Sequence, residues 1–137
     1  MYGRDKSLRP ILTFCPKIVL SLKIELEEAM LATHYVAQYV SDHLFVDGKI
    51  ENWLHILDLA HLSFTSLPKK WIISFIKNFS HHYYQRNRRM FLLNAGFAVR
   101  TMWNIVKVFV HNTTKQKLIF DRTNTSMIKF IKIHQIF

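Results

Sequence analysis

The chain has 137 residues, of which 50% are apolar and 14% aromatic, with three Gly and three Pro. This length suffices for one hydrophobic core but not for two ordinary domains, and this composition excludes a disordered or collagen-like chain. Nineteen Lys and Arg against nine Asp and Glu give a formal charge of +10, which favours contact with nucleic acid or an anionic membrane. The charge by itself does not choose between these two partners.

The cysteine count and the apolar runs bear on the compartment. Cys15 is the only cysteine, so no internal disulfide and no cysteine-based zinc cluster can form, and a reducing compartment is expected. The most apolar early stretch, residues 11–24, is interrupted by Pro16 and two lysines and is shorter than the roughly 20 residues that span a bilayer. Residues 1–6 lack the apolar region of a secretory signal. We therefore expect a cytoplasmic protein that associates with membranes peripherally.

The first half of the chain predicts a strand, a long helix and a second strand. Residues 8–16, LRPILTFCP, are a short apolar run between two prolines, which is typical of a strand entered from a turn at residues 3–7. Over residues 22–44, apolar side chains recur at three- and four-residue steps and acidic residues lie off that stripe. This pattern predicts an amphipathic helix that ends near Gly48. Residues 53–59, WLHILDL, then predict a strand.

The second half repeats the alternation of helix and strand. Pro68 predicts the start of a helix with an apolar side over residues 71–79. Residues 89–94 predict a strand, residues 99–109 a helix and residues 117–120 a fourth strand. Strands that alternate with helical connections indicate the α/β class. We expect a mainly parallel or mixed sheet of about four to five strands flanked by helices.

No pattern in the sequence indicates catalysis or a resident cofactor. The glycines, at positions 3, 48 and 96, are too dispersed to build a phosphate-binding loop. The eight histidines show no metal-binding spacing beside a carboxylate, and no serine lies in a Gly-x-Ser-x-Gly turn. Asp58 lies in an apolar strand, where a buried carboxylate is expected to accept hydrogen bonds from the next loop. We expect no enzyme activity, no metal and no cofactor.

A basic cluster before the third predicted strand is a candidate phosphate site. Arg86, Arg88 and Arg89 could hold a phosphate, although a solvated loop is the commoner interpretation of such a cluster. Nucleic-acid binding would require exposed aromatic side chains among the cations. Trp53 and Phe91 instead lie in apolar segments and are predicted to be in the core. Nucleic-acid binding is therefore the runner-up interpretation of the charge.

Five short segments carry a family resemblance. They read GRDKSLRPI at residues 3–11, VDGKIENW followed by ILDL within residues 46–59, NAGF at 94–97, WNIVKVF at 103–109 and TKQKL at 114–118. In this order they resemble G-x-D-K-x-G-R-P-v, a second block that ends in I-x-D-L, N-A-P-x-x-F, W-x-i-v-K-P-F and T-x-x-K-I. These blocks are those of the CRAL-TRIO lipid-binding domain family. Leu8 stands where that family usually has glycine.

The resemblance covers residues 3–120 and implies a lipid-binding domain over that range. Residues 121–137 are polar at first and then basic and apolar, which predicts a short helix or a basic apolar tail. Three features of the family are not found: the helical segment that precedes the domain and, after Phe120, both the gate helix, a lid over the acyl chains, and the closing L-P-x-x-y-G-G. We therefore expect a domain that is incomplete at both ends.

The resemblance also implies a headgroup site. In members that bind phosphatidylinositol, the threonine and lysine of T-x-x-K contact the inositol phosphate, and Thr114 and Lys117 match these positions. A hydroxyl and an ammonium together can neutralise a buried phosphate. Without the resemblance, Thr114 would be a turn cap and Lys117 a solvated cation at a strand edge. The segment YYQR departs from the family's Y-P-E-R by losing the proline and the acidic residue, and its Arg86 is the third headgroup candidate.

The expected function is binding and intermembrane transfer of a phospholipid, with phosphatidylinositol or a phosphoinositide as the first candidate and no catalytic step. The expected partners are this lipid and an anionic membrane surface, but no nucleic acid. The alternative is a domain without a lid that keeps the fold and serves as a scaffold or membrane-recruitment module. Its uncovered apolar groove would favour a homodimer. A basic nucleic-acid-binding domain is the third interpretation.

Overall fold

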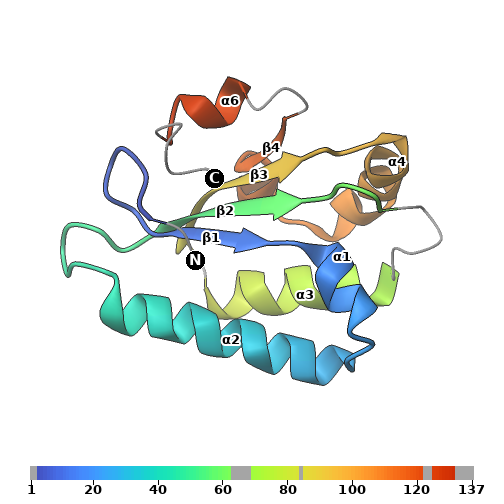
Figure 1. Cartoon of the computed structure of the whole chain (residues 1–137), viewed down its shortest axis with the longest axis horizontal. Helices are drawn as coiled ribbons and strands as arrows, with labels where there is room; N and C mark the ends of the chain where they lie inside the picture. Colours follow the sequence, from blue (N-terminus) through green and yellow to red (C-terminus); the bar gives the residue numbers. More distant parts are fainter. Residues whose placement is uncertain (1–2, 63–68, 84, 122–124, 132–137) are drawn as a thin grey trace.

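The computed structural model describes residues 3–62, 69–83, 85–121 and 125–131 (Figure 1). Within these residues, four strands form one sheet in the order β1-β2-β3-β4, and every neighbouring pair is parallel. The strands are β1 (Ile11–Phe14), β2 (Trp53–Asp58), β3 (Asn87–Leu93) and β4 (Leu118–Asp121). The α/β class and the parallel sheet predicted from the alternation of elements are confirmed.

Helices lie on both faces of this sheet. They are α1 (Pro16–Ser21), α2 (Leu26–His43), α3 (Lys69–His82), α4 (Phe97–Val106), the 3-10 helix η1 (Lys107–Phe109), α5 (Asn112–Lys115) and α6 (Thr125–Ile128). In Figure 1, α2 and α3 lie side by side below the sheet, whereas α6 lies above it. The sheet is therefore the middle of three layers.

Several predicted boundaries were wrong, for local reasons. The helix predicted over residues 22–44 begins at Leu26, because Lys23 adopts a positive φ of 52° that separates it from α1. That helix ends at His43, and Gly48, with a φ of 68°, instead closes a turn between Val46 and Ile50.

The other boundaries shift by a few residues. The strand predicted over residues 8–16 is shorter, and the one predicted over 89–94 begins two residues earlier. The helix predicted over residues 99–109 is divided into α4 and η1. Pro68, which was predicted to open α3, lies outside the described residues.

Apolar side chains that alternate along the strands are buried on both faces of the sheet. On the face towards α2 and α3, Leu12 and Trp53 pack with Ala37 and Val40 of α2. On the opposite face, the strands contribute Ile11, Leu54, Ile56, Phe91 and Leu93, which pack against Met127 and Ile131. A parallel sheet requires cover on both faces, and the segment around α6 supplies the second cover.

His55 is a polar side chain inside the core. It lies on β2 in ring contact with Trp53 and with Phe79 of α3, at centroid distances of 5.9 and 5.7 Å. Its Nδ1 atom is buried and has no hydrogen-bond partner among the described residues. Because burial disfavours the charged ring, the pKa of His55 falls from 6.5 to about 4. The imidazole is therefore neutral in the folded protein at physiological pH.

This burial predicts a loss of stability in mild acid. Below pH 6.5 the unfolded chain binds a proton at His55, whereas the folded chain binds it only near a pKa of about 4. The free energy of unfolding should therefore fall as the pH decreases through this window, in total by on the order of 3 kcal/mol. Urea unfolding between pH 7 and 4 measures it.

The matched comparison uses two histidine variants. His55→Leu should remove most of this pH dependence and leave the part from His34, whose pKa is also lowered by burial and by His82, whereas His43→Gln, at an exposed position, should retain the wild-type slope. Parallel loss of stability in wild type and His55→Leu would contradict the assignment to His55.

Candidate functional site

Thr114 and Lys117 are brought together by one tight turn that leads into β4. Thr114 lies in α5, and the backbone N–H of Lys117 donates to the Thr114 carbonyl at 3.1 Å. His111 precedes α5 and accepts a hydrogen bond from the Thr113 backbone N–H through its ring nitrogen. Both Thr114 and Lys117 are half-buried, and within the described part of the chain neither side chain has a hydrogen bond or ion pair. Their hydroxyl and ammonium groups are available to a ligand.

Arg89 is the cation that the fold places beside this turn. One of its terminal nitrogens donates to the Gln116 carbonyl at 3.3 Å, and its Nε is buried without a partner among the described residues. No Asp or Glu occurs in the sequence between Asp58 and Asp121. Neither Arg89 nor Lys117 forms an ion pair with a described carboxylate, so this end of the sheet favours an anion.

An apolar strip begins at the same edge and follows β3 and β4. We call it the β3–β4 apolar strip; it consists of the half-buried side chains of Leu57, Met90, Leu118 and Phe120, with Val99 and Trp103 of α4. Met90 and Leu118 are register partners, and the Met90 N–H donates to the Lys117 carbonyl at 2.9 Å. The ring of Trp103 lies 5.8 Å from that of Phe120. The strip therefore starts one residue after Lys117, on the face of the sheet opposite to the Arg89 side chain.

Arg86 lies in a different environment from Thr114 and Lys117. Its guanidinium donates to the backbone carbonyl of Glu51 at 3.1 Å, contacts the Glu51 carboxylate at 3.4 Å and lies over the Phe45 ring. It lines a groove of about 330 Å³ together with Asp42, Asp47 and Glu51. These carboxylates would repel a phosphate. Of Arg86, Arg88 and Arg89, the fold thus brings Arg89, a residue of β3, to the predicted site and holds Arg86 at Glu51.

Asp58 joins two of the segments that carry the family resemblance. Its Oδ1 accepts hydrogen bonds from the Ala60 backbone N–H at 3.0 Å and from the Asn94 side-chain amide at 2.8 Å. The expectation that this carboxylate is satisfied by the following loop is confirmed. The second bond also fixes the end of β2 to the end of β3, where the chain turns towards α4.

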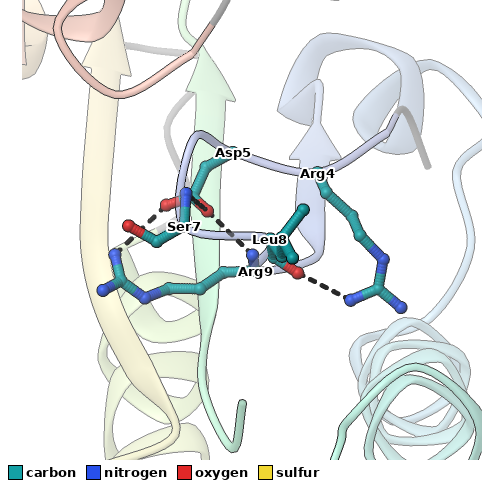
Figure 2. A network of polar contacts seen from close by, with 5 residues as sticks. All are labelled: Arg4, Asp5, Ser7, Leu8 and Arg9. Carbon is teal, nitrogen blue, oxygen red and sulfur yellow. Dashed lines mark hydrogen bonds and ion pairs between the residues drawn. The ribbon is translucent and has the colours of Figure 1, made fainter. Parts of the chain in front are cut away.

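The N-terminal loop is organised around the buried carboxylate of Asp5 (Figure 2). Oδ1 of Asp5 accepts from the backbone N–H groups of Ser7 and Arg9, and Oδ2 pairs with the Arg9 guanidinium at 3.1 Å. Arg4 donates to the carbonyls of Leu8 and of Leu44, the residue that follows α2. The loop thereby connects the start of β1 to the end of α2.

This loop holds Leu8 in a conformation that suits glycine. Leu8 has a φ of 63°, its backbone N–H donates to the Asp5 carbonyl, and its side chain is 61% exposed. The left-handed conformation costs a residue with a Cβ roughly 1–2 kcal/mol. The geometry therefore explains why the motif that this loop resembles has glycine at the position of Leu8.

The family model described as CRAL/TRIO domain matches residues 1–137. The chain belongs to the CRAL/TRIO family. No curated protein matches this CRAL/TRIO chain in sequence. Among solved structures, the crystal structure of Sfh5 is similar, with a TM-score of 0.63 and 13% identity, over 87% of this chain and 45% of the Sfh5 chain. At this identity the likeness shows the fold, and the CRAL/TRIO chain spans less than half the length of the Sfh5 chain.

Two further observations concern the chemistry open to this CRAL/TRIO domain. Among the described residues, no helix is both long and apolar enough to cross a membrane. Within the same residues, no group of His, Cys, Asp or Glu side chains could hold a metal ion. The Thr114–Lys117 turn, Arg89 and the apolar strip are therefore the candidate ligand site among the described residues.

The conformation of Leu8 predicts a stabilising substitution. Leu8→Gly should raise the free energy of unfolding by up to about 1 kcal/mol, because relief of the left-handed strain exceeds the extra entropy of glycine in the unfolded chain. Urea unfolding measures the change. Leu8→Ala is the control, since it removes the side chain but keeps the Cβ, and equal stability of the two variants would refute the strain argument.

Proposed function

We propose that this CRAL/TRIO domain binds a phospholipid, with Thr114 and Lys117 at the headgroup phosphate and the β3–β4 apolar strip against the acyl chains. The observation that carries the proposal is the half-buried Lys117 beside Thr114, one residue before that strip, with no ion pair or hydrogen bond from its side chain to a described residue. A phospholipid requires the same sequence of environments, first a cation with a hydrogen-bond donor and then an apolar surface. Binding and release of such a lipid involve no catalytic step.

The first lipid to test is phosphatidylinositol or a phosphoinositide. The support is the T-x-x-K spacing of Thr114 and Lys117, which resembles that of family members that bind phosphatidylinositol. Arg89 adds a second cation beside Lys117, which suits a headgroup that bears additional phosphates. Arg86 would join the headgroup only after leaving Glu51 and Phe45, so we propose a smaller contribution from it.

Lipid extraction tests the headgroup assignment. Mass spectrometry of organic extracts should find a phospholipid in about stoichiometric amount in the purified wild-type protein, and at least tenfold less in Thr114→Ala/Lys117→Ala. The reason is that the variant loses the phosphate's hydroxyl and ammonium donors. Lys115→Ala is the matched control, because Lys115 donates to Asn112 two residues from Lys117.

Two outcomes of the lipid extraction would contradict the proposal. A folded wild-type protein without bound lipid, which also fails to extract phosphatidylinositol from vesicles, would refute carriage and favour the scaffold function. Equal loss of lipid in Lys115→Ala would show that general charge, rather than the T-x-x-K pair, holds the lipid.

A basic surface with exposed apolar side chains supports docking on an anionic membrane. Phe97 of α4 is 86% exposed and Val108 of η1 is 70% exposed. Arg100 and Lys107 lie on the same two elements, and the Lys77 ammonium lies 5.7 Å from the ring centre of Phe109. Aromatic and aliphatic side chains among cations are the combination that binds the interface of an anionic bilayer. We propose that the domain meets the membrane through α4 and η1.

Vesicle sedimentation tests this orientation. Phe97→Gln/Val108→Gln should bind phosphatidylserine vesicles at least fivefold more weakly than wild type, because it loses the apolar groups that enter the interface. Leu31→Gln/Tyr35→Gln removes two exposed apolar side chains from α2 and is the matched control. Equal weakening in both variants would contradict docking through α4 and η1.

A further inference from the structure

The outer face of α2 carries a stripe of exposed apolar side chains. Leu31 and Tyr35 are 72% and 73% exposed, and Tyr39, which is 44% exposed and stacks on His43, continues the stripe one turn further. The inner face of the same helix is committed to the fold, since Ala37 and Val40 are buried against the sheet and His34 meets Tyr83 at 3.2 Å. Residues at four-residue steps share one side of a helix, so Leu31, Tyr35 and Tyr39 form a continuous line.

A carboxylate lies at each end of this line. Glu28 precedes Leu31 by three residues and Asp42 follows Tyr39 by three, so both lie on the same side of the helix. Both are exposed. They are separated by about 21 Å along the helix axis at 1.5 Å per residue. Along its axis, the outer face of α2 therefore carries a carboxylate, then three large apolar side chains and then a second carboxylate.

The charge of α2 is opposite in sign to that of the rest of the chain. The exposed carboxylates of the protein are Glu25, Glu27, Glu28, Asp42, Asp47 and Glu51, and all of them lie on or beside α2. No Lys or Arg occurs in the sequence between Lys23 and Lys49, although the whole chain has a formal charge of +10. Asp5, Asp58 and Asp121, the remaining carboxylates, accept hydrogen bonds within the fold.

We propose that the outer face of α2 is a docking surface for a basic amphipathic α-helix of a partner protein. A helix with three apolar residues at matching steps and a Lys or Arg beyond each end would bury Leu31, Tyr35 and Tyr39. It would also pair with Glu28 and Asp42. Helix-on-helix packing of this kind uses anchors at i, i+3, i+4 and i+7. The charges at the two ends set the register and exclude acidic partners.

Charge decides between this occupant and the alternatives. An anionic membrane is disfavoured because Glu27, Glu28 and Asp42 would face lipid phosphates. A second copy of the chain would have to dock through its outer α2 face, where like charges meet, or through α4 and η1, which the proposed function assigns to the membrane. A basic partner helix satisfies the apolar and the acidic requirement at once.

The test is calorimetric titration of the full chain with a defined probe. The probe is an 18-residue helical peptide with a leucine stripe at i, i+4 and i+8 and a lysine three residues beyond each end. Wild type should bind it, whereas Leu31→Gln/Tyr35→Gln should bind at least tenfold more weakly. Glutamine preserves helix propensity, and circular dichroism confirms folding. Phe97→Gln/Val108→Gln, which changes the basic surface of α4 and η1, should bind the peptide as wild type does.

A charge exchange makes the test specific. Glu28→Lys/Asp42→Lys should bind the lysine peptide at least tenfold more weakly than wild type. It should gain affinity for the same peptide with glutamates in place of the two lysines. The proposal would be overturned if wild type did not bind the lysine peptide or bound a scrambled peptide of the same composition equally well. It would also be overturned if Glu28→Lys/Asp42→Lys did not bind the glutamate peptide. Self-association of wild type that Leu31→Gln/Tyr35→Gln abolishes would assign the face to a second copy. Loss of vesicle binding in that variant would assign it to the membrane.

Discussion

The arrangement of this domain depends on one constraint, a parallel sheet whose strands follow one another in chain order. Connections between parallel strands are right-handed, so a sheet in the order β1-β2-β3-β4 places its crossover helices on one face. The other face is equally apolar and would lie open without a further segment. Met127 and Ile131 fill this role, because they pack on Ile11 and Phe91. The short segment around α6 is therefore part of the core, although its own helix has only four residues.

The same constraint decides where a ligand can approach. The long helix α2 and α3 bury the lower face of β1 and β2, whereas β3 and β4 on that side are only half covered by α4. The half-covered strip begins at the strand edge where Lys117 and Arg89 are found. Because β3 and β4 start together, Arg89 and Lys117 lie at the end of the sheet where the strip begins, although the Arg89 side chain is on the face opposite to Met90. A phospholipid, with a charged head and apolar chains, requires a charged site near an apolar surface.

The distribution of charge gives the domain two unlike sides. Cations prevail from α3 to α5, where the sequence has no carboxylate, and the exposed carboxylates are confined to α2 and the turn after it. At physiological ionic strength such fields extend about 8 Å, which is enough to orient the protein near a charged surface. An anionic membrane would therefore meet the side of α4 and η1 and leave α2 turned outwards. The stripe of Leu31, Tyr35 and Tyr39 would then remain accessible to a partner while the domain is on the membrane.

The sequence by itself determined the class, the order of the four strands and of the longer helices, and the family, because apolar periodicity and short motifs are local properties; the short helices α1 and α5 were missed. It also located the turn of Thr114 and Lys117, whose two residues lie within one T-x-x-K block. Only the tertiary structure decided which arginine joins that turn, since the bonds of Arg86 to Glu51 and of Arg89 to Gln116 cross 35 and 27 residues and follow from strand register. The cover from Met127 was likewise invisible, because a contact across the sheet depends on residues far along the chain, and no residue type in the sequence marked the positive φ at Lys23.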